Sequence, residues 1–163
     1  MQARIAPVKI TGRTAIWEMR SAPEFLMDGA RKRARNSDWK GLIDYCTKNG
    51  MDWECVRLLR PKAGAILRSG HEDSGKVVEF LAIKTPNVKF GNAALRFLER
   101  RGLFMNVAEI AARAECAEVG TMAVDTLLTN GRKKEMEKLA LREGKVHGSV
   151  ALYVELCLAD IDG

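Results

Sequence analysis

The chain has few of the residues on which many enzymes and metal proteins depend. It contains two histidines, His71 and His147, and a single glutamine among 163 residues. It has no HExxH zinc motif, no nucleophile elbow and no glycine-rich dinucleotide loop. Neither histidine has sequence neighbours that resemble a triad or a metal set, so we interpret both as surface or loop residues. The sequence therefore predicts that the protein is not an enzyme, has no catalytic residue and needs no cofactor.

Cysteine pairs at metal-ligand spacing are also absent. Cys46, Cys55, Cys116 and Cys157 lie far apart, with no CxxC pair among them. Each lies among apolar residues, which is typical of a reduced thiol in a hydrophobic core. Because a tetrahedral zinc site needs clustered ligands, we expect no metal site.

Long apolar runs are missing as well. No stretch approaches the roughly 18 uncharged apolar residues of a membrane-spanning helix. Residues 1–13 carry basic side chains and no apolar run, which does not fit a secretory signal, so we expect a cytoplasmic protein. The single glutamine, beside abundant Arg, Lys and Glu, is typical of a thermophilic source. The hydrophobic fraction of 47% is nevertheless that of a globular chain with a real core.

The GxxxxGK pattern in "GHEDSGKV", residues 70–77, invites comparison with a phosphate-binding loop. Val77 occupies the place of the Ser or Thr that binds magnesium in such a loop, and no strand is expected before it. We therefore interpret this stretch as a helix end, a polar loop and the start of a new helix.

Positive charge is concentrated in the first part of the chain. Residues 1–70 contain 14 Lys and Arg against 7 Asp and Glu, whereas residues 71–163 contain 13 against 14. Pro7 and Gly12 discourage a helix in residues 1–13, which we predict to be an extended basic arm. A second basic cluster lies in "ARKRAR", residues 30–35. The candidate nucleic-acid-binding residues are Arg4, Lys9, Arg13, Arg31, Lys32, Arg33 and Arg35.

The remainder of the chain predicts helices separated by short breaks. Thr14 is a plausible N-cap for a first helix over residues 15–19, and Pro23 fits the first turn of the next. Asn36-Ser37 interrupts that second helix, and Gly50 is expected at the left-handed position after the third. Connections of mostly two to six residues favour antiparallel neighbours.

One helical unit recurs in the second half. "ALRFLERRGLFMNVAEIAARAE" (residues 94–115) and "AVDTLLTNGRKKEMEKLALREG" (residues 123–144) align at a shift of 29 residues, with Leu98 on Leu127 and Gly102 on Gly131. Apolar residues in both recur at i, i+3 and i+4, so each helix has one face to bury. "LIDYCTKNGMDWECVRLL", residues 42–59, aligns Gly50 with Gly131. Stacked hairpins of this kind share a continuous core.

The segment "AVDTLLTNGRKKEMEKLALREG", with "EFLMDG", resembles part of a small uncharacterised archaeal helical-repeat family, and the frame is similar to α-α superhelix proteins in general. The resemblance implies a fold and no site. We expect an all-α chain of about ten helices, arranged as a right-handed stack of antiparallel helical hairpins (α-solenoid-like). The expected domains are the basic arm, residues 1–13, and one helical-repeat domain, residues 14–163. An irregular bundle is the alternative, since the 52 residues from Gly50 to Gly102 are not a multiple of 29.

Two functions follow from these observations. Helical repeats commonly hold a protein partner on a concave surface, which favours a non-enzymatic scaffold. The charge asymmetry favours instead a protein that docks on RNA or the ribosome through its basic N-terminal half. We interpret Trp17, Trp39 and Trp53 as core residues, with stacking on bases as the alternative. The basic side chains have an alternative of their own, a solvated face at a helix end. Neither function involves a membrane.

Overall fold

The computed structural model describes residues 5–7, 17–19, 22–142, 146 and 148–162. The chain divides into two compact units, residues 1–62 and residues 63–163, and each is described by itself. The single domain expected over residues 14–163 stays a prediction. Arg4, Lys9 and Arg13 of the expected arm lie outside the described residues.

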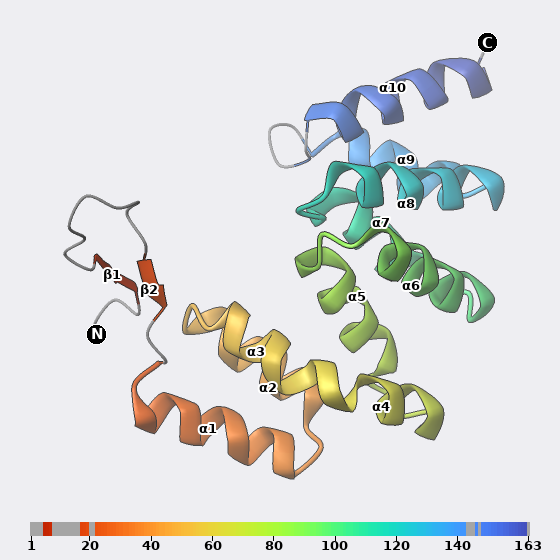
Figure 1. Cartoon of the computed structure of the whole chain (residues 1–163). Helices are drawn as coiled ribbons and strands as arrows, with labels where there is room; N and C mark the ends of the chain where they lie inside the picture. Colours follow the sequence, from red (N-terminus) through yellow and green to blue (C-terminus); the bar gives the residue numbers. More distant parts are fainter. Residues whose placement is uncertain (1–4, 8–16, 20–21, 143–145, 147, 163) are drawn as a thin grey trace. The chain divides into compact units, whose positions relative to one another are not determined.

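The first unit contains a short pair of strands and a group of helices (Figure 1). Strand β1 (Ile5–Pro7) runs antiparallel to β2 (Trp17–Met19), with Ile5 opposite Met19. The helix predicted over residues 15–19 is therefore wrong at Trp17–Met19. Five residues are too few to nucleate a stable helix, and pairing with a partner strand satisfies the same backbone groups.

The helices of this unit are α1 (Glu24–Arg35), α2 (Trp39–Lys48) and α3 (Asp52–Leu59), followed by the 3₁₀ turn η1 (Arg60–Lys62). Asn36 and Ser37 separate α1 from α2, as predicted, and Ser37 has a positive φ of 56°. Asp38 then caps α2 by accepting a hydrogen bond from the Gly41 N–H at 3.0 Å. The three helices contact one another and bury a core that includes Trp39, Leu42, Met51 and Leu59.

The second unit is built of helices α4 (Ala63–Ser69), α5 (Ser74–Lys84), α6 (Val88–Arg100), α7 (Phe104–Arg113), α8 (Ala117–Thr129), α9 (Lys133–Ala140) and α10 (Gly148–Asp162). Its hydrophobic core draws on α5 to α10. The prediction of an all-α protein is confirmed, because the elements of the described residues are helices apart from the short β1–β2 pair.

Three of the hairpins turn in the same way. After α2, α6 and α8 the second residue beyond the helix is a glycine, Gly50, Gly102 or Gly131, with φ of 66°, 67° and 66°. In each turn the N–H of the residue after the glycine donates to the carbonyl five positions earlier in the chain, which is the Schellman motif. These bonds run from Met51 to the Cys46 carbonyl (2.7 Å), from Leu103 to Leu98 (2.9 Å) and from Arg132 to Leu127 (2.9 Å). The predicted positive φ of these glycines is confirmed.

The faces predicted to be buried are buried in most places. Leu98, Leu127 and Ile110 have no exposed surface, and Leu139 is 4% exposed. Ala140, aligned with the buried Ala111, is exposed because α9 ends at this residue.

Helix contacts recur along the second unit. Helix α6 contacts α8, and α8 contacts α10; similarly α5 contacts α7, and α7 contacts α9. A Cβ atom added at Gly91 in α6 would lie 2.7 Å from Cγ2 of Val119 in α8, and one at Gly120 would lie 2.7 Å from Cγ2 of Val150 in α10. The two glycines are 29 residues apart, so the repeat seen in the turns extends to the seams between hairpins.

Gly120→Ala is expected to destabilise the protein, whereas Gly64→Ala is expected to stabilise it by up to about 1 kcal/mol. The new methyl group at position 120 meets a buried, β-branched Val150 side chain that has little freedom to move. At exposed Gly64 the nearest atom belongs to the flexible end of Arg68. Urea unfolding of both variants shows whether each substitution raises or lowers the free energy of unfolding. A stabilising Gly120→Ala would show that the seam is loose.

Candidate functional site

The basic cluster of α1 is partly occupied by bonds within the protein. The Arg31 guanidinium donates to Glu24 at 2.6 Å and to Asp28 at 3.3 Å. The hydrogen bond and the charge of Glu24 raise the pKa of Arg31 above its ordinary value. Arg33 donates to the Gly29 carbonyl at 2.9 Å and lies 4.0 Å from the ring centroid of Tyr45. Two of the four predicted cations therefore have intramolecular roles.

Lys32 and Arg35 remain exposed on α1. The structure brings together only the four α1 residues of the predicted set. The positive surface they can offer a partner is smaller than the sequence suggests, because an ion-paired or stacked side chain must first give up its partner.

The tryptophans have different environments. Trp39 is 5% exposed in α2 and belongs to the core, as predicted, but Trp53 is 50% exposed on α3, so its interpretation as a core residue is wrong. Arg57 and Arg60 follow it at i+4 and i+7, and both are exposed. The set of Trp53, Arg57 and Arg60, here called the α3 stripe, was not predicted. The repeat contains a signal that could have predicted this exposure, because Trp53 aligns with Lys134, a polar residue.

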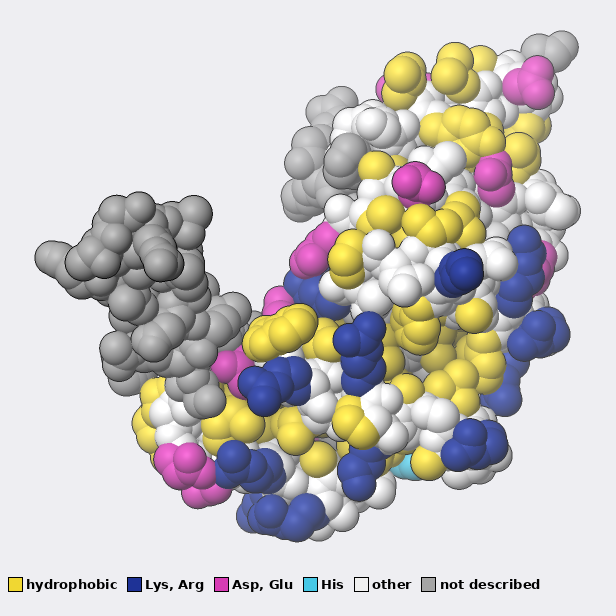
Figure 2. Space-filling view, in the orientation of Figure 1, with side chains coloured by type: hydrophobic (Ala, Val, Ile, Leu, Met, Phe, Trp, Pro, Cys, Tyr) yellow, Lys and Arg dark blue, Asp and Glu magenta, His cyan; other side chains and the backbone are white. Residues whose placement is uncertain are grey.

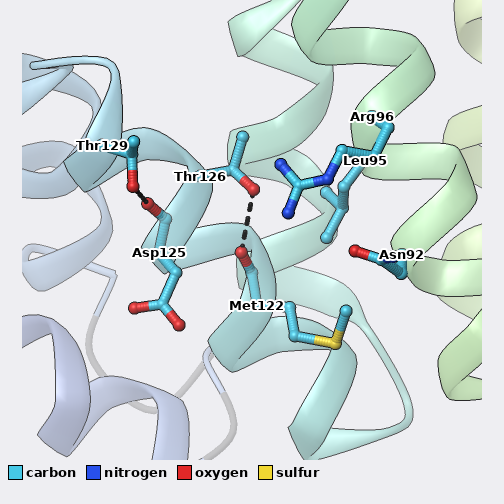
Figure 3. A pocket seen from close by; sticks show the side chains of 7 residues that line it. All are labelled: Asn92, Leu95, Arg96, Met122, Asp125, Thr126 and Thr129. Atoms are coloured by element: carbon cyan, nitrogen blue, oxygen red, sulfur yellow. Dashed lines mark hydrogen bonds between the residues drawn. The ribbon is translucent and has the colours of Figure 1, made fainter.

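A narrow cavity of about 100 Å³ lies between α6 and α8, lined by Asn92, Leu95, Arg96, Met122, Asp125, Thr126 and Thr129 (Figure 3). The two threonine hydroxyls donate to carbonyls of their own helix, Met122 and Asp125. Arg96 is paired with Glu99 at 2.8 Å. The volume of the cavity is that of a few water molecules and well below that of an ordinary ligand pocket. The cavity is a seam between helices, and its arginine, aspartate and threonine side chains already have partners.

An open depression of about 560 Å³ lies over the start of α9, lined by residues 131–135 and Glu137. Arg132 donates to Glu135 at 2.9 Å and lies 4.7 Å from the ring centroid of Phe104. Lys133 lies 4.0 Å from Glu137. These carboxylates offset the positive charge at the helix start, so the depression is a weak candidate for an anion site.

Carboxylates that could suggest acid–base chemistry join neighbouring helices instead. Each of the four helix contacts named above has such a polar link. The links are Glu79 to Asn106 (2.8 Å, α5 to α7), Glu109 to Arg142 (2.8 Å, α7 to the residues after α9), Glu99 to Asn130 (2.7 Å, α6 to the C-cap of α8) and Asp125 to the Tyr153 hydroxyl (α8 to α10). Burial raises the pKa of Glu79, while Lys76 and Asn106 oppose that rise. We assign these carboxylates a structural role.

The stretch from Gly70 to Val77 has the structure of a helix start. His71 Nδ1 accepts a hydrogen bond from the Asp73 N–H at 3.0 Å. The Ser74 hydroxyl donates to the His71 carbonyl at 2.7 Å, and α5 begins at Ser74. Gly75 is buried, and a Cβ there would lie 3.0 Å from Leu103. The stretch is thus a helix end, a loop and the start of a new helix, as the sequence analysis predicts.

The four cysteines are free. Cys46, Cys55 and Cys157 are buried, and Cys116 is half-buried just before α8, so the core prediction holds for three of them. A hydrogen bond with Cys46, together with burial, raises the pKa of the Cys55 thiol. Within the described residues, no three His, Cys, Asp or Glu side chains lie together in a way that could hold a metal ion.

Helix α10 presents an unusual outer face. Val150, Val154 and Cys157 are buried, while Leu152 and Leu156, one turn apart, are each 58% exposed and Ile161 is 43% exposed. The helix contains Glu155, Asp160 and Asp162 but no Lys or Arg. Figure 2 shows hydrophobic and acidic side chains over α10, and Lys and Arg over α1 and α3. The apolar and acidic outer face of α10, here called the α10 face, consists of Leu152, Glu155, Leu156 and Asp160.

The chain matches no protein-family model, no curated protein and no solved structure. Its resemblance to helical-repeat proteins therefore stays a prediction. No helix in the described part of the chain is long and apolar enough to cross a membrane.

Proposed function

We propose that residues 63–163 form a short right-handed α-solenoid and that the protein is a non-enzymatic scaffold for a protein partner. Three recurring features support the solenoid. They are the Schellman turns, the seams at Gly91 and Gly120, and the polar links that join each helix to the second helix after it. Solenoids use their extended surfaces to hold other proteins. A partner on the concave surface, as the sequence analysis expects, belongs to the same proposal.

The α10 face is the observation that carries the binding role. A helix face that no neighbouring repeat covers is normally polar in a solenoid. On α10, Leu152 and Leu156 expose more than half of their surface instead. Exposed apolar patches rimmed by polar residues mark interaction sites.

The occupant we assign to this face is a basic amphipathic helix of another protein. Helix α10 packs on α8 as α8 packs on α6, so one more helix on its outer face continues the same packing. Glu155 and Asp160 lie beside the leucines, and no residue of α10 is positively charged. Leucines on the incoming helix would cover Leu152 and Leu156, and its Lys or Arg would face the carboxylates.

Replacing Leu152 and Leu156 by lysine is expected to abolish partner binding while leaving the fold intact, because both side chains are largely exposed. The full chain and the double variant are used to capture proteins from nuclease-treated lysate. The captured protein is then purified and titrated by calorimetry. The expected result is a partner with a basic amphipathic helix whose affinity falls by at least tenfold.

Met105→Lys is the matched control, because Met105 is 78% exposed on α7 and outside the α10 face. It should bind like the unaltered protein. Equal binding by the unaltered protein and the double variant would remove the α10 face from the proposal. If sedimentation shows that the unaltered protein self-associates and the double variant does not, the face joins copies of this chain and the scaffold proposal is wrong.

The alternative function, docking on RNA or the ribosome, is favoured by a different observation. Of the α1 residues predicted for this function, Arg31 is paired with Glu24 and Arg33 is stacked on Tyr45. The α3 stripe, by contrast, combines an exposed aromatic ring with cations.

A further inference from the structure

The α3 stripe has a composition unlike the other exposed faces of its unit. Trp53 exposes half of its surface, and no ion pair with Arg57, Arg60 or the exposed Lys62 occurs among the described residues. Glu54, next to Trp53, is buried, so its carboxylate is not exposed on this surface. An indole ring and two cations that have no ion pair with the described residues thus share one side of α3.

The spacing of these residues places them in one row. Positions i, i+4 and i+7 lie on the same side of a helix, and Arg60 keeps right-handed helical angles (φ −52°, ψ −49°) although α3 formally ends at Leu59. Seven residues of helix rise about 10 Å, comparable to about three nucleotide steps at 3.4 Å per step in one strand.

We propose that the α3 stripe binds single-stranded RNA, with one base stacked on Trp53 and neighbouring phosphates on Arg57 and Arg60. Exposed aromatic rings beside a positively charged track are the two parts of sequence-tolerant single-strand sites. A duplex keeps its base faces stacked internally, so the ring at position 53 has nothing to stack on there. The site therefore selects single strands and reads no sequence.

This site differs from the one predicted from the sequence. The α1 cluster has charge without an exposed tryptophan, and Arg31 and Arg33 are engaged by Glu24 and Tyr45. It is also independent of the proposed scaffold, because the α10 face belongs to the other unit.

The test is fluorescence anisotropy of the full chain with a labelled 12-nucleotide oligo(U) and with a 12-base-pair RNA duplex, between about 50 and 200 mM salt. Oligo(U) should bind more tightly than the duplex and quench the tryptophan emission. Trp53→Ala should weaken oligo(U) binding by about five- to 150-fold and remove the quenching, whereas Trp53→Phe should retain most of the affinity. Arg57→Gln with Arg60→Gln should lower the salt slope by about 0.7 for each lost phosphate contact.

The repeat supplies a matched control. Lys134 and Lys138 of α9 align with Trp53 and Arg57, are exposed, and have no aromatic ring in the row. Lys134→Gln with Lys138→Gln should leave oligo(U) binding unchanged, as should Phe25→Ala, which removes an exposed ring from α1.

Several results would overturn the proposal. These are no binding at 50 mM salt, duplex binding as tight as single-strand binding, and a Trp53→Ala variant that binds like the unaltered protein. A chain that ignores oligo(U) but binds vesicles rich in anionic lipid would assign the stripe to a membrane surface. Circular dichroism shows whether Trp53→Ala folds. If it does not, Trp53→Phe and the arginine variants test the proposal instead. For a stacking site, the arginine changes must weaken binding and therefore reduce the quenching of tryptophan emission by oligo(U).

Discussion

Truncating Leu98 or Leu127 to alanine is expected to lower the free energy of unfolding by about 2–5 kcal/mol. Both side chains are completely buried in the same core cluster, and each carbonyl accepts the bond that closes its Schellman turn. Removing the side chain leaves a cavity in a close-packed interior, which adds to the lost burial of apolar surface. Urea unfolding followed by far-ultraviolet circular dichroism measures the change.

The two truncations should cost similar amounts, because the residues occupy equivalent positions 29 residues apart. Leu141→Ala is the control, since that leucine is 82% exposed and its loss should change stability by no more than about 0.5 kcal/mol. A cost below about 1 kcal/mol at either buried position would contradict the packing described here.

Replacing both Gly102 and Gly131 by alanine is expected to destabilise the protein by about 2–4 kcal/mol, roughly 1–2 kcal/mol for each position. Both glycines have φ near +67°, where an L side chain crowds the following carbonyl. Apart from the glycine itself and its two chain neighbours, no atom lies within 4 Å of the added Cβ at either position. The cost is therefore a backbone cost, which denaturation of the single and double variants measures.

Two further variants test whether the loss of stability comes from backbone strain at positive φ. Gly148→Ala also places its Cβ in open space, but that glycine has no positive φ, so its effect should be small. Ser37→Gly makes the reverse change at a position with φ of 56° and should stabilise the protein by about 1 kcal/mol. Equal effects at Gly148 and Gly102 would show that backbone strain is not the cause.

The helices and their ends could be predicted because their causes are local. Apolar spacing defines the buried face of each helix, and only glycine enters the left-handed region without strain, so Gly50, Gly102 and Gly131 mark three turns in the sequence. The strand at Trp17–Met19 could not be predicted in this way. It depends on pairing with Ile5–Pro7, a contact between residues about twelve positions apart.

The candidate sites depended more on tertiary structure. The sequence shows how many cations "ARKRAR" contains, but only the folded chain brings Tyr45 under Arg33, because α2 must first pack on α1. The same applies to the leucines of α10, because apolar residues are spread around this helix and the sequence does not reveal which of them remain exposed.

The sequence by itself determined that this chain is helical, where most helices end and which residues repeat at 29 positions, because periodicity and backbone sterics act over a few residues. The tertiary structure decided that Trp39 is buried while Trp53 is exposed, which cations are neutralised, and which apolar face lacks a neighbour. Exposure and ion pairing are set by contacts between distant segments, and those contacts exist only after the helices have packed.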